Sequence, residues 1–370
     1  MSRLKAYIDA LGCAILSRWS AAEYDPTTFS IVAEESLSEA TPCDHVTFRE
    51  LVSWVIDSRQ IPSQKNLMTG FGQPAITVFH HERFIVEALC WLDGSTSIHQ
   101  HSFSGAFALA SGSSVTTRYT FTKASGGDDE FATGELTVRS ADWLKPGSVE
   151  RIQAGPGLIH SVFHLECPTI TVVARTHGER GAGPQWTYHA PTVAFNEFTE
   201  NQRKEAQLKI LDAVCRASPD DYLESAARVV ALSDAATTYA VLRKVQRDTW
   251  SHPEVVEALL GAARLSQSEA RALAKALNEL RRVRALGTLR TTLRADAERA
   301  TLAVLMCVPD PRMVLDVMSR VHGDAQRAVT VIRSLEREGV EVSEDDESIH
   351  LVLRESGGRR HVFTMAKPGC

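Results

Sequence analysis

The chain has 370 residues, of which 44% are hydrophobic and 23% charged, and its formal net charge is −6 at pH 7. These values are ordinary for a globular protein and exclude a mainly disordered chain, because they supply enough apolar surface for a core. No run of Lys and Arg dominates a segment. This argues against nucleic-acid binding, which usually needs a basic surface to neutralise phosphates.

The cysteines and the apolar segments indicate where the protein works. The seven cysteines are scattered and form no CxxC pair, which favours reduced thiols. Asp9 interrupts the first apolar stretch, so the N-terminus does not resemble a signal peptide. No segment approaches the roughly 18 uninterrupted apolar residues of a membrane span. We therefore expect a cytoplasmic protein that does not bind membranes.

Residues 1–70 are predicted to form short helices that pack on the following domain. Leu4, Ile8 and Ile15 share one face at helical spacing. A second amphipathic helical pattern runs through residues 48–56.

The pattern changes between residues 71 and 195, where short apolar runs alternate with Gly, Asp and Ser clusters. The candidate strands lie at residues 75–79, 83–92, 105–110, 114–121, 135–138, 148–152, 159–165 and 169–175. Short strands at this spacing are typical of an all-β sandwich or jelly roll.

Residues 200–345 are predicted to be a separate all-α region. Ala, Leu, Arg and Glu dominate, and breaks near Pro219, Pro253 and Pro309 divide the region into helices of a bundle or short solenoid. Residues 346–370 are predicted to form a terminal hairpin and tail. We expect a protease-sensitive linker at residues 190–205 and consider the helical region a candidate surface for a homodimer or a protein partner.

Three histidines form the most informative pattern. His99 and His101 lie one residue apart on a predicted strand, so both imidazoles face the same side. His160 ends the later run GPGLIH at residues 155–160. We predict that the three bind one metal ion and leave coordination positions open for chemistry. Histidine suits iron, zinc, nickel and copper, so the ligands alone do not choose the metal.

The two motifs resemble those of the cupins, in which HxH precedes a run similar to Pro-x-Gly-x-x-His. Leu89-Cys90-Trp91, followed by Ser97-Ile98-His99-Gln100-His101, is similar to the thiol dioxygenases, the cysteine dioxygenase branch of that superfamily. The resemblance covers residues 76–175. It implies an α+β protein with a cupin double-stranded β-barrel (jelly roll), preceded by short helices and followed by an all-α domain. It also implies Fe(II), O2 and a small-molecule substrate, either a thiol or a related metal-chelating metabolite.

The sequence also departs from that branch. Ala106 stands near a cysteine that these enzymes often crosslink to a tyrosine, and Val173 or Arg175 stands near their last-strand triad. His177 lies slightly beyond and is a candidate for the missing imidazole. Arg175 is a candidate cation for an anionic substrate. Cysteine itself is therefore not implied as the substrate.

Other candidate site residues come from position on the predicted strands. His164 follows His160 by four residues on the same strand face, so it is a candidate support for the ligands or alternative ligand, the third reading being a plain strand residue.

Three further residues are candidates for substrate binding. The family's carboxylate-binding arginine has no clear counterpart, and His80 or His81 falls closest to its position. Arg118 and Tyr119 are adjacent on one strand, so only one of them points inward.

Two alternatives to a thiol dioxygenase stay open. One is a non-thiol cupin oxygenase of specialised metabolism. The other is a metal-binding cupin sensor or binding module whose helical domain recruits a partner.

Overall fold

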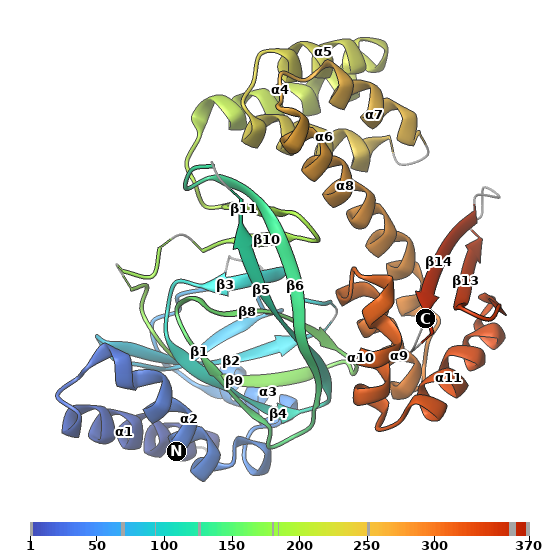
Figure 1. Cartoon of the computed structure of the whole chain (residues 1–370). Helices are drawn as coiled ribbons and strands as arrows, with labels where there is room; N and C mark the ends of the chain where they lie inside the picture. The colour runs from blue at the N-terminus through green and yellow to red at the C-terminus, as the bar shows by residue number, and fades with distance from the viewer. Residues whose placement is uncertain are drawn as a thin grey trace. The chain divides into compact units, whose positions relative to one another are not determined.

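The structure is a computed structural model that describes residues 3–67, 71–92, 94–124, 127–179, 181–183, 185–249, 252–354 and 360–367. Its contacts divide the chain into two compact units. The first, here called the barrel unit, comprises Met1–Tyr119, Val138–Gln185 and Thr288–Cys370. The second, the helical unit, comprises Thr120–Thr137 and Trp186–Gly287. Figure 1 labels most of the elements of both.

The barrel unit is built on two antiparallel sheets. The first has the strand order β1 (Ala75–His80), β2 (Phe84–Trp91), β9 (Thr169–Thr176), β4 (Gly105–Ser111) and β7 (Val149–Ile152). The second contains, in order, β6 (Phe131–Leu144), β5 (Ser114–Lys123), β8 (Gly155–His164) and β3 (Ile98–His101). Strands β5 and β6 continue into the helical unit. Each predicted strand overlaps one of these, and β3 carries the HxH motif.

Strand β2 shows how the two sheets enclose a core. Successive side chains of a strand point to opposite faces. Val86 and Ala88 therefore belong to one apolar cluster with the N-terminal helices. Leu89 and Trp91 belong to a second cluster, which includes Val162 from the other sheet. Apolar side chains of both sheets thus meet in the interior, and the predicted jelly-roll barrel is confirmed.

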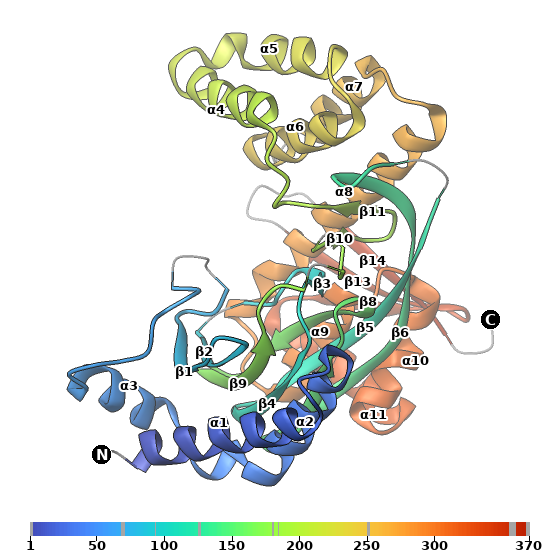
Figure 2. The ribbon, with the colours of Figure 1, turned by 90° about the vertical axis from the view of Figure 1, so that its left-hand side faces the viewer.

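The N-terminal helices cover the outer face of the first sheet, as Figure 2 shows. They are α1 (Arg3–Ala21), α2 (Phe29–Ala40) and α3 (Phe48–Asp57), with short 3₁₀ turns at Pro26–Thr28 and Pro42–Asp44. Ile8, Ile15 and Phe29 are at most 1% exposed and pack in the cluster with that sheet. The predicted N-terminal helical segment is therefore present and lies on the barrel.

The described residues of the C-terminal part of the barrel unit form three α-helices and a small sheet. The elements are η3 (Thr288–Thr291), α9 (Asp296–Cys307), α10 (Pro311–His322), α11 (Ala325–Ser334), η4 (Leu335–Glu338), β12 (Glu341–Glu344), β13 (Ser348–Arg354) and β14 (Arg360–Ala366). Strands β13 and β14 pair antiparallel, as predicted, and their connection lies outside the described residues.

The helices of region 200–345, which the sequence predicts as one domain, divide between the two units. Helix α9 has direct contacts with the barrel: the Tyr119 hydroxyl on β5 donates a buried hydrogen bond of 2.8 Å to the Cys307 carbonyl. Such long-range contacts depend on which surface each helix buries. A helical pattern in the sequence does not identify that surface.

The helical unit contains β10 (Thr187–His189), β11 (Val193–Phe195), α4 (Gln202–Ala217), α5 (Pro219–Ala231), α6 (Ala235–Asp248), α7 (Pro253–Ala262) and α8 (Gln267–Gly287). Phe195 of β11 pairs with Phe131 at the start of β6. Both rings pack with the fully buried Tyr239 of α6. Strands of three residues are too short for an alternating pattern, so β10 and β11 are absent from the predicted strands.

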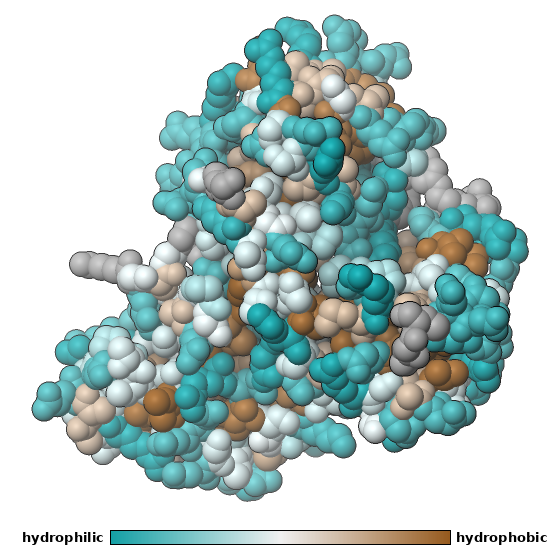
Figure 3. Space-filling model, in the orientation of Figure 1, coloured by the Kyte–Doolittle hydropathy of each residue, from teal (hydrophilic) through white to brown (hydrophobic). Residues whose placement is uncertain are grey.

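On the face shown in Figure 3, hydrophobic residues form small patches separated by hydrophilic ones. Isolated patches of this kind are normal on protein surfaces. Within the described part of the chain, no helix is long and apolar enough to cross a membrane.

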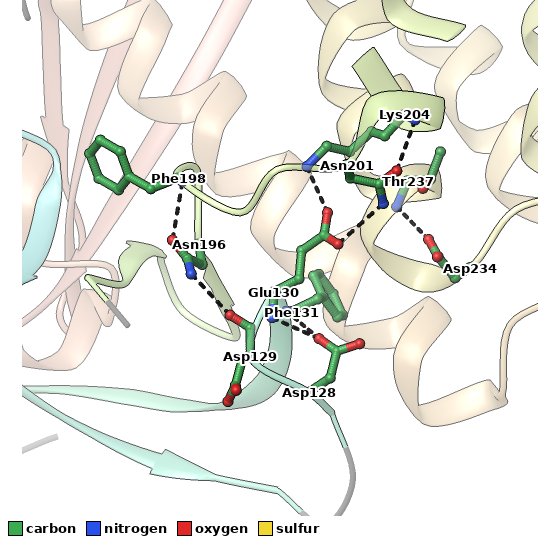
Figure 4. A network of polar contacts seen from close by, with 10 residues as sticks. All are labelled: Asp128, Asp129, Glu130, Phe131, Asn196, Phe198, Asn201, Lys204, Asp234 and Thr237. Carbon is green, nitrogen blue, oxygen red and sulfur yellow. Dashed lines mark hydrogen bonds and ion pairs between the residues drawn. The ribbon is translucent and has the colours of Figure 1, made fainter. Parts of the chain in front are cut away.

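Polar contacts hold the segment that the sequence predicts as a linker (Figure 4). Lys204 Nζ pairs with Glu130 Oε1 at 2.6 Å, and Asn201 Nδ2 donates to Glu130 Oε2 at 3.3 Å. The Asn196 N–H donates to the Glu130 carbonyl at 2.9 Å. Asn201 also caps helix α4 by accepting from the Lys204 N–H. Much of residues 190–205 is therefore ordered by its neighbours within the helical unit.

Candidate metal centre

The three histidines of the two motifs converge inside the barrel unit. His99 and His101 lie on β3, and His99 is the direct ladder partner of His160 on β8. One ring nitrogen of each lies within 4.8 Å of the others. Nε2 of His101 is 3.0 Å from Nε2 of His160. The three residues are only 3% to 5% exposed. The predicted three-histidine group is therefore confirmed as a cluster.

Hydrogen bonding fixes the tautomer of His99. Its Nδ1 is 2.8 Å from the Ser97 carbonyl oxygen, which only accepts, so Nδ1 carries the proton. The lone pair then lies on Nε2, as a metal ligand requires. This Nε2 is buried and has no hydrogen-bond partner in the described part of the chain. An unpaired buried nitrogen is costly, and a metal ion bound at Nε2 would satisfy it.

Burial keeps these imidazoles neutral. It lowers the pKa of His99 and holds the pKa values of His101 and His160 well below 6.5. Neighbouring imidazoles act in the same direction, with Arg175 for His101 and Arg118 for His160. A histidine must be deprotonated to bind a metal, and these imidazoles meet that condition at neutral pH.

The donor set fits a transition-metal ion. Two nitrogens bound at right angles, each about 2.1 Å from one ion, lie about 3.0 Å apart. The separation of the His101 and His160 nitrogens is 3.0 Å. Three neutral imidazoles suit iron, zinc, nickel or copper and leave further coordination positions open.

Aromatic rings surround the three imidazoles. The Phe71 ring meets His99 edge to face at 5.9 Å, and Phe103 lies 4.7 Å from His101. Phe107 on β4 lies 6.1 Å from His160. These apolar neighbours contribute to the desolvation that lowers the pKa of each imidazole.

A buried ion pair lies beside this site. Arg175 Nε is 2.7 Å from Glu87 Oε2, and Asn66 Nδ2 donates to the other Glu87 oxygen at 2.8 Å. The guanidinium also lies 4.7 Å from the centre of the Phe103 ring. The same Phe103 ring packs against the His101 ring. The structure thus places Arg175 near the imidazoles, with a carboxylate as its partner.

Arg118 and Tyr119 point to opposite faces of β5, as predicted. Arg118 is the direct ladder partner of His160, so both side chains lie on the same face of the sheet. It forms an ion pair with Glu150 on β7. The Tyr119 hydroxyl bonds to Cys307 of α9 instead. Arg118 is therefore brought to the site, whereas Tyr119 lies away from it.

His164 lies outside the three-histidine group. Its ring stacks on Trp91 at 4.5 Å, and its Nδ1 is 2.9 Å from the Ser114 hydroxyl. Burial and Arg290 lower its pKa to about 3. The histidine is neutral and buried, and within the described residues the metal-binding group does not include it.

His80 and His177 also lie outside the three-histidine group. Their rings are 6.1 Å apart, and His177 Nε2 donates to the His81 carbonyl at 3.3 Å. His80 is exposed, and partial burial together with Lys65 lowers its pKa. Their predicted roles in catalysis and substrate binding stay predictions.

The sequence interpretation did not include the acidic partners Glu87 and Glu150. Glu87 is 2% exposed although it is charged. It stands in the middle of the otherwise apolar strand FIVEALCW. A lone carboxylate in such a run is the signal that points to a buried polar site.

Comparison with known proteins adds distant similarity. No protein-family model matches the chain, and no curated protein matches it. Hydroquinone 1,2-dioxygenase from Sphingomonas sp. TTNP3 is 11% identical over 30% of this chain and 71% of its own, with a TM-score of 0.24. A double-stranded β-helix protein from Klebsiella pneumoniae is 17% identical over 36% and 98%, with a TM-score of 0.21. Oxalate decarboxylase from Lactobacillus farciminis is 13% identical over 39% and 38%, with a TM-score of 0.21.

These identities and scores are too low to assign an activity. The strand topology and the converging imidazoles themselves show a double-stranded β-barrel with a candidate metal centre.

Proposed function

We propose that this chain is a metal-dependent cupin enzyme, a mononuclear non-haem Fe(II) dioxygenase that oxidises a small thiol or a related metal-chelating metabolite with O2. The convergence of three buried imidazoles carries the proposal. When bound by His99, His101 and His160, the ion would supply positive charge and open coordination positions for a substrate donor atom and O2.

The protein's own residues prepare the site. The Ser97 carbonyl holds the His99 ring in the tautomer that presents Nε2 to the centre. Phe71 and Phe103 cover two of the imidazoles and limit access by water. Phe71 is 38% exposed, whereas Phe107 is 6% exposed, so the ring beside His99 is the more accessible to solvent of the two.

The charged pairs favour a polar substrate. Arg175 and Arg118 bring cations close enough to His101 and His160 to lower their pKa values. Both guanidinium groups are held by carboxylates, which fixes their orientation. We propose that one or both orient an anionic or polar group of the substrate.

Cysteine is not the favoured substrate within this proposal. Ala106 is fully buried in the cluster with the N-terminal helices, so it faces away from the barrel interior. Its position therefore offers no sulfur to the site. The charged interior keeps a non-thiol oxygenase as the second candidate. The cytoplasmic location and the homodimer or protein partner stay predictions.

Metal analysis tests the centre. Wild-type protein is expected to contain about one transition-metal ion per chain, and His99→Ala and His160→Ala are expected to lose most of it. His80→Ala serves as a control, because His80 lies outside the three-histidine group. Undiminished metal in both ligand variants would contradict the site.

Oxygen uptake tests the reaction. Protein loaded anaerobically with Fe(II) is expected to consume O2 only with a suitable substrate from a panel of thiols, catechols and 1,3-dicarbonyls. Mass spectrometry identifies the products. Rapid stoichiometric conversion of cysteine to its sulfinate would contradict the expectation that cysteine is a poor substrate. No O2 uptake with any compound, together with zinc bound in cells, would reject the oxygenase and leave a metal-binding sensor.

A further inference from the structure

The ladder that carries the metal ligands is short and irregular. Strand β3 has four residues, and its register with β8 shifts between His99 and His101. His99 pairs with His160, whereas His101 pairs with Gly155. Irregular pairing re-aims side chains but leaves fewer ladder hydrogen bonds to hold them. The position of two ligands therefore depends on how the preceding segment is anchored.

Residues 94–97, which precede β3, are anchored on β8. Ser95 forms an isolated bridge with Phe163. The Thr96 N–H donates to the Val162 carbonyl at 2.9 Å, and the Val162 N–H donates to Thr96 Oγ1 at 2.8 Å. This stretch continues the pairing beyond the two ladder positions of β3.

Arg290, from the C-terminal part of the barrel unit, bonds to both segments where this pairing ends, at Gly94 and His164. Nη2 of Arg290, on η3, donates to the Gly94 carbonyl at 2.8 Å and to the His164 carbonyl at 3.0 Å. Its guanidinium lies 4.3 Å over the ring of Phe163. The Gly94 and His164 backbones also meet directly, with a hydrogen bond of 3.4 Å. One cation thus holds the segment before β3 and the end of β8 together.

Helix α9 adds a second contact at the same place. Arg299 Nη1 donates to the carbonyl of Leu165, the residue after His164, and its Nε donates to the Leu293 carbonyl at 3.1 Å. Hydrogen bonds from charged donors are stronger than neutral ones. Two guanidinium groups therefore bind consecutive carbonyls at the end of β8.

We propose that Arg290 is a positioning residue of the metal centre, and that residues 288–307 fix the geometry of the three ligands through the backbone at Gly94 and His164. The proposal rests on the three-histidine metal site proposed above. It gives the C-terminal helices of the barrel unit a role in metal binding, although they contribute no ligand.

Metal affinity tests the proposal. Arg290→Met is expected to weaken Co(II) binding by up to about 10-fold, the lower end of the effect of losing a group bonded directly to a metal ligand, because Arg290 acts through the backbone. The visible spectrum of the bound Co(II) is expected to change as well, because the ligand geometry changes. Arg290→Lys keeps the charge but not the fork of donors, so an intermediate loss is expected. Arg320→Ala is the control, since Arg320 pairs with Asp316 on the exposed surface of α10.

The contacts of Arg290 with the Gly94 and His164 carbonyls are here called the Arg290 clamp. Hydrogen exchange of the metal-free protein tests this clamp independently of metal. Faster exchange in peptides covering residues 94–101 is expected for Arg290→Met and not for Arg320→Ala. If wild-type protein bound no Co(II) while exchange rose as expected, the metal site would fail and the clamp would stand.

Wild-type affinity, spectrum and exchange in Arg290→Met would overturn the proposal, and so would an equal loss in Arg320→Ala. Should Arg290→Met not fold, wild-type affinity and exchange in Arg290→Lys would overturn it.

Discussion

His164 offers a quantitative test of the barrel interior. It is 3% exposed, stacks on Trp91 and bonds to Ser114. Burial, reinforced by the nearby Arg290, lowers its pKa from 6.5 to about 3. In the unfolded chain the same side chain has a pKa of about 6.5.

The sign of the effect follows from the two pKa values. Below pH 6.5 the unfolded chain takes up a proton that His164 in the folded protein does not. The free energy of unfolding therefore falls as the pH drops from about 6.5 toward 3. At about 1.36 kcal/mol per pKa unit, His164 alone removes about 1.9 kcal/mol between pH 7 and pH 5.

His164→Asn tests this value. The amide retains a partner for Ser114 but does not titrate, and loss of the ring stack lowers stability at pH 7. Urea unfolding of the metal-free proteins at pH 7 and pH 5 gives the free energy of unfolding. The fall between the two pH values is expected to be about 1.9 kcal/mol smaller in the variant. Equal falls in both proteins would show that His164 takes up its proton at the same pH in the folded protein as in the unfolded chain, and would refute the reasoning.

Three further predictions concern the ion pairs and the linker segment. Arg175→Met leaves the carboxylate of Glu87, whose side chain is 2% exposed, without its cation. It is expected to lower the free energy of unfolding in urea by about 3 kcal/mol. Adding Glu87→Gln should recover part of this free energy, and no recovery would contradict the pairing. Lys204→Met is expected to destabilise the helical unit by about 3 kcal/mol, again with partial recovery on adding Glu130→Gln. A urea unfolding midpoint equal to that of the wild-type protein would count against the network in Figure 4. Limited trypsin digestion is expected to spare residues 190–205, and an early cut there would favour the loose linker expected from sequence.

The three-histidine cluster was predictable because its pattern is local. His99 and His101 share a strand face by the period of two, and the Pro-Gly run before His160 resembles a known second motif. The strands of the barrel were predictable for a similar reason, since alternation and turn residues act over a few positions. Even the opposite orientations of Arg118 and Tyr119 follow from adjacency on one strand.

The surroundings of the ligands could not be predicted in this way. The sequence separates Arg290 from Gly94 by 196 positions and Arg175 from Glu87 by 88. Nor does the local pattern of α9 distinguish it from the helices of the other unit. The sequence by itself determined which residues suit a metal and on which strand face they lie. Only the tertiary structure decided which distant charges meet those strands, because such contacts depend on how separate elements pack and not on the spacing within any one of them.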